Sequence, residues 1–447
     1  MSSLSTITGR PVRTIATMPG ISDSVTATRT TTTRTTLCSS GVSGVETSSS
    51  IQAQLTLEAV FNAYFDCRRN KRNAESQLAF EVDLERNLVR LWRELIDGTY
   101  EIGPSIAFVV KYPKVREVWA ASFRDRIVHH LIYNAVKDRY YAHFIRDTYA
   151  CIPGRGLHDG LQRVSGFARS ATRNGSREAF VLKADVANFF TSINQNIAVE
   201  LFERRVSEEW VRKLLRQVVF HDPRQTAHLQ SSQELFDKVP RHKSLMLAPR
   251  GFGLPIGNLT SQFLANLYLN ELDQFAKHEL KAIHYGRYMD DIVVFGQDPV
   301  WLNDIYERME AFVRERLGIR FHPNKKSVQP VHRGFRFTGF VVKPGRTHLR
   351  PGTLDRARAK IVAWEEAGRP IDKNSLSALS SSVTSYLAML RRVSGFRERR
   401  SLCQFASSLF VYPDADFTKL ICPQIKAKTG PINMNIRRVA DVGKRSA

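Results

Sequence analysis

The chain has 447 residues, 43% of them hydrophobic, so it is long enough to bury a sizeable core and is not a disordered protein. Lys and Arg number 66 against 43 acidic residues; the net charge of +23 predicts a polyanionic partner, for which nucleic acid fits best. The five cysteines stand singly, which argues against structural zinc and suits a reducing cytoplasm. No run of about 18 apolar residues and no signal peptide is found, so we expect a cytoplasmic location and no contact with a membrane.

The N-terminal segment, residues 1–52, is rich in Ser and Thr and has no helical or strand periodicity, so we expect a flexible tail. Its arginines resemble those of an organelle transit peptide, but an unstructured leader or a misassigned start explains them equally well. Residues 53–180 follow. We expect this segment to begin with helices. Leucines recur at spacings of three and four from Leu84 to Leu95, which predicts a helix that ends near Gly98.

A β-like stretch, "SIAFVVKYP", comes next, and the following residues alternate before they turn helical from Ile127 to Val136. His129 and His130 are adjacent and point to different faces of that helix, so a shared metal is not expected. Basic residues are frequent in this region, and any single one is more often solvated than functional. They are Lys111, Lys114, Arg116, Arg124 and Arg126.

Residues 181–345 should form the central part of the chain. A short buried strand runs from Val181 to Val186, and the polar span 220–250 is interpreted as an inserted loop. "GFGLPIG" lacks the Lys-Ser/Thr of a phosphate-binding loop and is better interpreted as a turn before a helix. Another helix is expected at about 299–317, then a strand pair around "RFTGFVV". The remaining segments are a helical, Arg-rich region over residues 346–410 and a C-terminal tail over 411–447.

Paired acids, Asp290 and Asp291, interrupt two apolar runs in "HYGRYMDDIVVFG", which predicts a hairpin with both carboxylates at its tip. An acidic pair in a turn is usually only solvated. Adjacent carboxylates repel each other, however, and become favourable where a divalent cation binds. Asp185, which ends the strand "VLKAD" 105 positions upstream, supplies a third acid unless it merely caps a neighbouring helix. Three carboxylates from two β segments suit two-metal phosphoryl transfer.

Four segments in order, "KADVANFFTSI", "GLPIGNLTSQ", "RYMDD" and "FRFTGF", resemble the sequential motifs of bacterial reverse transcriptases over about residues 80–400. "SFRDRIVHHLI", "DTYACIPGRGLHDG" and "RYMDDIVVFGQDP" are most similar to the diversity-generating retroelement type. Related bacterial reverse transcriptases of antiphage defence are the alternative, because the insertion ending "PRHKSLMLAPRGFGLPIGN" resembles theirs as well.

The resemblance implies an α+β right-hand polymerase fold, with N-terminal helices and fingers in 53–180, a palm with an antiparallel sheet in 181–345 and a helical thumb in 346–410. It implies an RNA-directed DNA polymerase that uses two Mg²⁺ ions, with Mn²⁺ able to substitute. An RNA template, a DNA or RNA primer and deoxynucleotides are the implied substrates. A structured non-coding RNA or an accessory protein is the implied partner.

The resemblance also implies roles for individual residues. Asp185, Asp290 and Asp291 match the catalytic, metal-binding acids, and the carbonyl of Val186 matches a further metal ligand. Phe190 matches the aromatic gate against a ribose 2′-hydroxyl, with ordinary core packing as the alternative. The residues that match other subsites are Lys114 and Arg116 for the triphosphate and base, Lys326 or its neighbour Lys325 for protonating pyrophosphate, and Phe337, Gly339 and Phe340 for the primer grip.

One departure from the family pattern is Ile256, which stands before Gly257 where many relatives have Gln at the base of the nucleotide pocket. Specificity that depends on a hydrogen bond falls steeply when the bonding group is absent, so low fidelity is our hypothesis. It agrees with the adenine-directed mutagenesis of the retroelement group. A nucleic-acid-binding scaffold without turnover is the competing class, against which the intact acids and Phe190 weigh.

Overall fold

The computed structural model describes residues 55–69, 74–111, 114–367, 373–393, 395–405 and 416–417. The predicted N-terminal tail lies outside these residues, as does the predicted C-terminal tail apart from Asp416 and Phe417. Among the described residues, no helix combines the length and the apolar character that crossing a bilayer requires.

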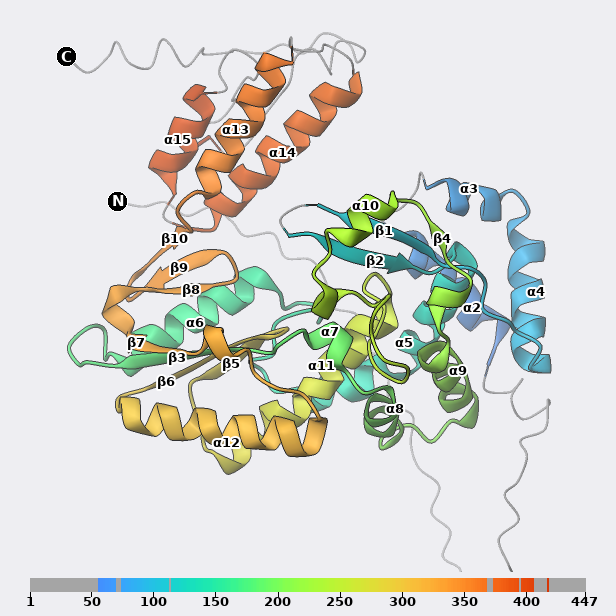
Figure 1. Cartoon of the computed structure of the whole chain (residues 1–447), viewed down its shortest axis with the longest axis horizontal. Helices are drawn as coiled ribbons and strands as arrows, with labels where there is room; N and C mark the ends of the chain where they lie inside the picture. The colour runs from blue at the N-terminus through green and yellow to red at the C-terminus, as the bar shows by residue number, and fades with distance from the viewer. Residues whose placement is uncertain are drawn as a thin grey trace, which may run out of the picture. The chain divides into compact units, whose positions relative to one another are not determined.

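The N-terminal part consists of helices (Figure 1): α2 (Leu57–Arg68), α3 (Glu75–Glu81), α4 (Leu84–Asp97) and the long α5 (Phe123–His143). α2 and α3 pack against α5, and α4 packs against α2 and α3. The predicted leucine helix is confirmed as α4, which buries Leu88 and Leu91. It ends at Gly98, whose φ of 70° is the left-handed conformation that glycine adopts without a steric penalty.

A small sheet joins β1 (Ile106–Val110), β2 (Arg116–Ala120) and β4 (His228–Leu229). β1 pairs with β2 as an antiparallel hairpin and with β4 in parallel. The span 220–250, predicted as a loop, therefore contains a strand, and it also contains the short helix α10 (Gln233–Asp237). Its few apolar side chains, such as Phe236 and Leu245, share a buried cluster with Trp119 of β2, which explains why a mostly polar segment is ordered.

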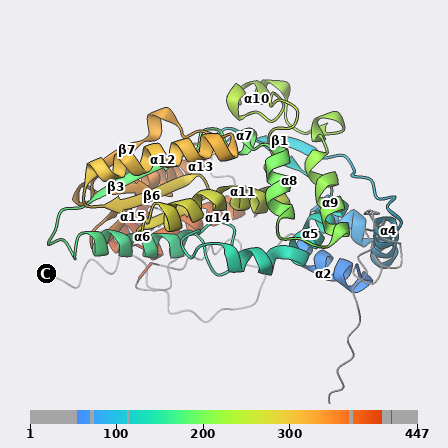
Figure 2. The same cartoon turned by 90° about the horizontal axis from the view of Figure 1, so that it is seen from below.

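The central sheet has the order β5 (Tyr285–Tyr288), β6 (Asp291–Gly296), β3 (Phe180–Asp185), β7 (Ser327–Pro330), and every neighbouring pair is antiparallel. Side chains of β6 alternate between two cores, because Ile292 and Val294 belong to one buried cluster and Val293 and Phe295 to the other. Figure 2 shows α12 (Pro299–Leu317) on one face of the sheet and α6 (Leu157–Ala171) on the other.

The remaining elements surround this sheet or follow it. Helices α7 (Phe189–Ser192), α8 (Gln195–Glu203), α9 (Glu209–Phe220) and α11 (Leu259–Gln274) lie between β3 and β5 in the chain. A third sheet of β8 (Phe335–Phe337), β9 (Phe340–Lys343) and β10 (Arg346–Leu349) shares its apolar core with α6. Helices α13 (Thr353–Glu366), α14 (Lys373–Arg391) and α15 (Phe396–Phe405) have a core of their own. The predicted α+β class is confirmed.

We expect Gly286→Ala to lower the free energy of unfolding by about 1–3 kcal/mol, because overpacking strains a rigid core. A Cβ at Gly286, in β5, would lie 2.8 Å from the Oη atom of the fully buried Tyr149. Urea unfolding measures the difference. Gly166→Ala in α6 is the matched control, because nothing lies within 4 Å of its added Cβ. Equal stabilities for the two variants would contradict the prediction.

Candidate active site

The three predicted acids meet at one end of the central sheet. Asp185, the last residue of β3, is the direct register partner of Asp291, the first residue of β6. Asp290 lies in the two-residue turn between β5 and β6, and its carbonyl accepts a hydrogen bond from the amide of Val186 at 3.3 Å. Two segments separated by more than 100 residues thus place three carboxylates at one edge, as the sequence predicted.

Burial raises the pKa of Asp290, and the nearby Asp185 raises it further. Burial also raises the pKa of Asp291, although the ammonium of Lys183, 3.3 Å from its carboxylate, opposes this effect. Asp185 forms an ion pair with Lys325. A cluster of partly buried like charges beside lysines is the electrostatic pattern of a site that binds cations or anionic substrates.

The predicted Mg²⁺ cage is not assembled in this structure. Among the described residues, no three His, Cys, Asp or Glu side chains are grouped so that they could hold a metal ion. Two of the acids are paired with ammonium groups, Asp185 with that of Lys325 and Asp291 with that of Lys183. The donors themselves are of the right kind, because carboxylate and carbonyl oxygens are the hard ligands that Mg²⁺ prefers.

A buried arginine holds the turn that carries the acids. Arg287 in β5 is fully buried, and its guanidinium forms a two-pronged ion pair with Asp273 of α11, with N···O distances of 2.7 and 2.6 Å. Its Nη1 atom donates a hydrogen bond of 3.0 Å to the carbonyl of Met289, the first residue of the turn. Met289 has a φ of 52°, which a side chain with a Cβ rarely adopts, so this bond stabilises a strained position.

The carboxylate of Asp273 is saturated with donors. Besides Arg287, the hydroxyls of Tyr285 and Thr148 donate to it at 2.6 and 2.7 Å. Asn266 of α11 accepts from Arg287 through both its side-chain and its main-chain oxygen, each at 3.3 Å. A buried charge pair is tolerated only where hydrogen bonds replace the lost water, and this network meets that condition.

A cavity of about 1230 Å³ opens over the acids and collects most of the predicted site residues. They are Asp185, Asp290, Asp291, Val186, Lys114, Arg116, Phe190 and Ile256. Phe190 is half-buried and reaches the cavity, whereas its neighbour Phe189 is in the core. Phe190 also packs against that core, so this side chain both lines the cavity and contributes to packing.

The main chain positions Ile256 beside β2. Its carbonyl accepts a hydrogen bond of 2.7 Å from the amide of Trp119. Gly257 follows with a φ of 127°, and a Cβ there would lie 3.1 Å from the carbonyl of Trp119. Gly257 is therefore needed for the close approach of two backbones, and the side chain that faces the cavity belongs to Ile256.

The structure distinguishes the two adjacent lysines, Lys325 and Lys326, that the sequence left as alternatives. The ammonium of Lys326 donates to Glu307 at 2.9 Å and lies over the ring of Tyr306, outside the cavity, whereas the neighbouring Lys325 lines the cavity. The predicted primer-grip residues are divided as well. Phe337 and Phe340 are fully buried in the core, while Thr338 and Gly339 between them reach the cavity.

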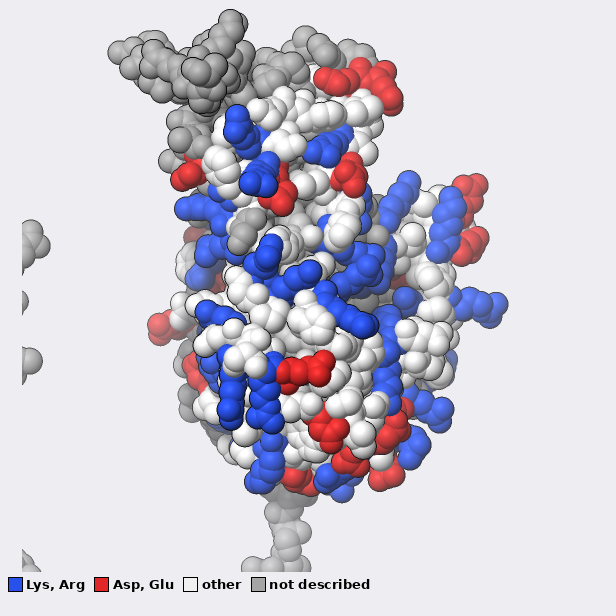
Figure 3. Space-filling model, turned by 90° about the vertical axis from the view of Figure 1, so that its left-hand side faces the viewer, with Lys and Arg blue, Asp and Glu red and all other residues white. Residues whose placement is uncertain are grey.

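Sequence reasoning did not single out Lys243, which lines the same cavity together with three cations of the basic region after residue 346: Arg350, Arg356 and Lys360. The first belongs to the insertion, and the others come from the segment after β10 and from α13. Only their basic character marks them in the sequence, in a chain where basic residues are common. On the face shown in Figure 3, Lys and Arg form a band across the middle, with few acids among them.

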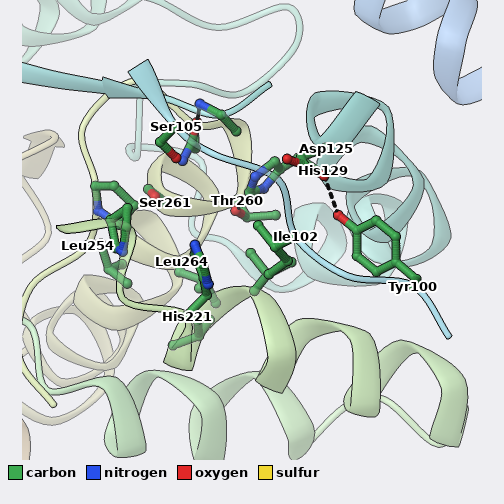
Figure 4. A pocket seen from close by; sticks show the side chains of 16 residues that line it. Tyr100, Ile102, Ser105, Asp125, His129, His221, Leu254, Thr260, Ser261 and Leu264 are labelled. Carbon is green, nitrogen blue, oxygen red and sulfur yellow. Dashed lines mark hydrogen bonds between the residues drawn. The ribbon is translucent and has the colours of Figure 1, made fainter. Parts of the chain in front are cut away.

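A second pocket, of about 30 Å³, lies between α5 and α11 (Figure 4). Asp125 there accepts hydrogen bonds from the hydroxyls of Tyr100 at 2.7 Å and Ser122 at 2.6 Å. Burial lowers the pKa of His129 to about 3, so this histidine is neutral, and its Nδ1 atom lies 2.6 Å from the hydroxyl of Thr260. These side chains satisfy one another, which indicates a structural pocket.

Comparison with known proteins shows which family of proteins this chain resembles. The family model "Reverse transcriptase (RNA-dependent DNA polymerase)" matches residues 111–342, slightly more than half of the chain. "Protein YkfC" of Escherichia coli (strain K12) is 21% identical over 304 residues, which cover 60% of this chain and 73% of that protein.

Solved structures of telomerase are also similar. Apo telomerase from Candida tropicalis matches with a TM-score of 0.42 and 10% identity, over 69% of this chain and 56% of that one. Telomerase from Candida albicans, in complex with a TWJ fragment of telomeric RNA, matches with a TM-score of 0.41 and 11% identity, over 68% and 55%. The chain spans about half the length of these telomerases.

The fold and the matched region define a polymerase of the right-hand type. The chain belongs to the reverse transcriptase family, whose members are RNA-directed DNA polymerases.

We expect Arg287→Met to lower the free energy of unfolding by about 3–5 kcal/mol, because it leaves the Asp273 carboxylate buried without its partner. The double variant Arg287→Met/Asp273→Leu should lose less than the single variant. Urea unfolding measures both. Arg308→Met, which removes an exposed pair with Asp304, is the control and should change stability by less than about 1 kcal/mol. A loss at Arg287 as small as that of the control would refute the supporting role.

Proposed function

We propose that this chain makes cDNA by nucleotidyl transfer at the cavity over the central sheet, with Asp185, Asp290 and Asp291 as its catalytic acids. The observation that carries the proposal is the direct pairing of Asp185 with Asp291, beside the turn that holds Asp290, in a cavity lined by cations. Acids at the end of a buried sheet are held rigidly, and basic walls attract polyanionic substrates.

In this proposal, the three carboxylates and the Val186 carbonyl would hold two Mg²⁺ ions, for which Mn²⁺ can substitute. The metal supplies a lowered pKa for the attacking 3′-hydroxyl and charge compensation for the leaving pyrophosphate. Lys183 and Lys325 form ion pairs with two of these carboxylates, those of Asp291 and Asp185. Because Lys325 lines the cavity and Lys326 does not, Lys325 takes the proposed role of proton donor to pyrophosphate.

The other parts of the chain follow the same scheme. Lys114 and Arg116 would contact the triphosphate and base of the incoming nucleotide, and Phe190 would exclude a ribose 2′-hydroxyl. Fingers over residues 53–180, a palm over 181–345 and a thumb over 346–410 would enclose an RNA template and a DNA or RNA primer. Arg350 and Arg356, which line the cavity from the C-terminal side, are suited to phosphates of that duplex.

We further propose a low-fidelity enzyme of the diversity-generating type, which acts in the cytoplasm with a structured RNA or an accessory protein. Support comes from the sequence "GLPIGNLTSQ" and from the position of Ile256 in the cavity, where an apolar side chain cannot hydrogen-bond a nucleotide. A role in antiphage defence is the second candidate, supported by the ordered insertion 220–250.

Primer extension on an RNA template with Mg²⁺ and four deoxynucleotides tests the activity. We expect Asp290→Asn and Asp291→Asn each to reduce the rate about 1000-fold or more, because several kcal/mol of transition-state stabilisation depend on the metal ligands. Asp304→Asn, an exposed acid on α12, should match the wild type. If either active-site variant retains the wild-type rate, the assignment of the acids is wrong.

Sequencing of the same products tests fidelity. We expect wild-type errors to concentrate opposite template adenines, and Ile256→Gln to reduce them about fivefold, since one added hydrogen bond contributes about 1 kcal/mol. Ile256→Val is the control and should keep the error spectrum. An unchanged spectrum in Ile256→Gln would refute the link between this residue and fidelity, and errors spread evenly over the template bases would favour the defence role.

A further inference from the structure

Three cations around the cavity have no acidic partner. Lys114 and Arg116 lie at the start of β2, and Lys243 ends the short helix Arg241–Lys243 in the insertion 220–250. Within the described part of the chain, none of their side chains forms an ion pair or a hydrogen bond. This distinguishes them from Lys325 and Lys183, which neutralise acids of the site.

The insertion is anchored on both sides of Lys243. On one side, the hydroxyl of Thr191, next to the proposed gate Phe190, donates a hydrogen bond of 3.0 Å to the carbonyl of His242. On the other side, the carboxylate of Glu117 accepts from the Ser244 hydroxyl and, at 2.9 Å, from the Leu245 amide. Lys243 is therefore placed at the cavity by fixed backbone on either side.

Glu117, which anchors the insertion, lies on the same strand as Arg116, a proposed contact of the nucleotide. Successive side chains of a strand point to opposite faces, so Arg116 is exposed and reaches the cavity while Glu117 is 3% exposed and bonds the insertion. The indole of Trp119 completes the anchor by donating to Glu117 at 3.1 Å. β2 thus links the position of Lys243 to that of Arg116.

These cations affect one another. Partial burial lowers the pKa of Lys243, and the charges of Lys114, Lys325 and Arg116 lower it further, against the opposing effect of Asp185. Like charges gathered without acidic partners repel each other, and an anion with several charges would relieve that repulsion. A nucleoside triphosphate is such an anion, and all three cations line the one cavity.

We propose that Lys243 binds the triphosphate of the incoming deoxynucleotide, so that the 220–250 insertion forms one wall of the nucleotide site. The inference rests on the proposed function. A nucleic-acid backbone is the less suitable ligand, because Lys243 lies near Phe190 and β2, and these carry the proposed contacts of the incoming nucleotide. The cations suited to the duplex, Arg350 and Arg356, come from the opposite end of the chain.

Steady-state primer extension with full-length Lys243→Ala tests the proposal. We expect the KM for deoxynucleotide to rise about tenfold with kcat nearly unchanged, because a charge-assisted contact to the ground-state triphosphate is removed. Lys243→Arg should retain most of the wild-type KM. Lys238→Ala is the matched control, since this exposed lysine of the same insertion does not line the cavity and should leave KM unchanged.

A second measurement separates this proposal from the proposed activity. Inorganic tripolyphosphate should raise the unfolding temperature of the wild type and of Lys238→Ala, and raise that of Lys243→Ala clearly less, whether or not the chain makes DNA. Equal stabilisation of all three proteins would overturn the proposal. So would an unchanged deoxynucleotide KM in Lys243→Ala together with a weaker Kd for template–primer, which would assign Lys243 to the nucleic-acid backbone.

Discussion

The position of the acidic turn depends on the buried ion pair between Arg287 and Asp273. A charged pair without water is costly, and the cost is offset here because every oxygen of the carboxylate has a donor. The pair ties α11 to β5, and through the Met289 carbonyl it also ties the core to the turn. The buried Arg287–Asp273 pair thus supports the geometry of an acidic turn that faces solvent.

Charge balance explains why a basic protein has acids at its centre. Burial raises the pKa values of Asp290 and Asp291, and the neighbouring carboxylate of Asp185 raises both further. Two lysines oppose this rise in pKa, Lys183 on β3 for Asp291 and Lys325 before β7 for Asp290. The same cavity therefore presents negative charge at its base and positive charge on its walls, which matches a substrate that is itself a cation-bound polyphosphate.

Periodicity and motif order were sufficient to predict much of this molecule. The helices α4 and α12, the strand β3 and the hairpin that carries the paired acids were predicted from the sequence, because their patterns are local. Both acids were expected at the tip, but Asp291 is the first residue of β6 and only Asp290 lies in the turn. The meeting of Asp185 with the hairpin was predicted from residue type and motif order. Lys325 and Lys326 could not be told apart, because their different surroundings depend on Glu307 and Tyr306, which only the fold brings near.

The insertion shows a different limit of sequence reasoning. Its span is polar, and the few apolar residues that order it, among them Phe236 and Leu245, have no regular spacing. Their partners lie on β1 and β2, more than 100 residues earlier. Lys243 and the supporting pair Arg287–Asp273 were missed for the same reason, since a charged residue acquires its role only from neighbours that are distant in the chain.

The parallel pairing of β4 with β1 has a consequence for how this protein can vary and move. Through β4, the insertion adds an edge strand to the sheet of β1 and β2. Glu117 of β2 binds the far end of the insertion at Leu245, so both attachments are to the same hairpin. The stretch of the insertion between these two attachments therefore has both ends fixed to one hairpin. A residue added or removed in this stretch would shift one attachment relative to the other. Any movement of the hairpin would also strain the hydrogen bond from Thr191 to the carbonyl of His242, which ties the insertion to α7.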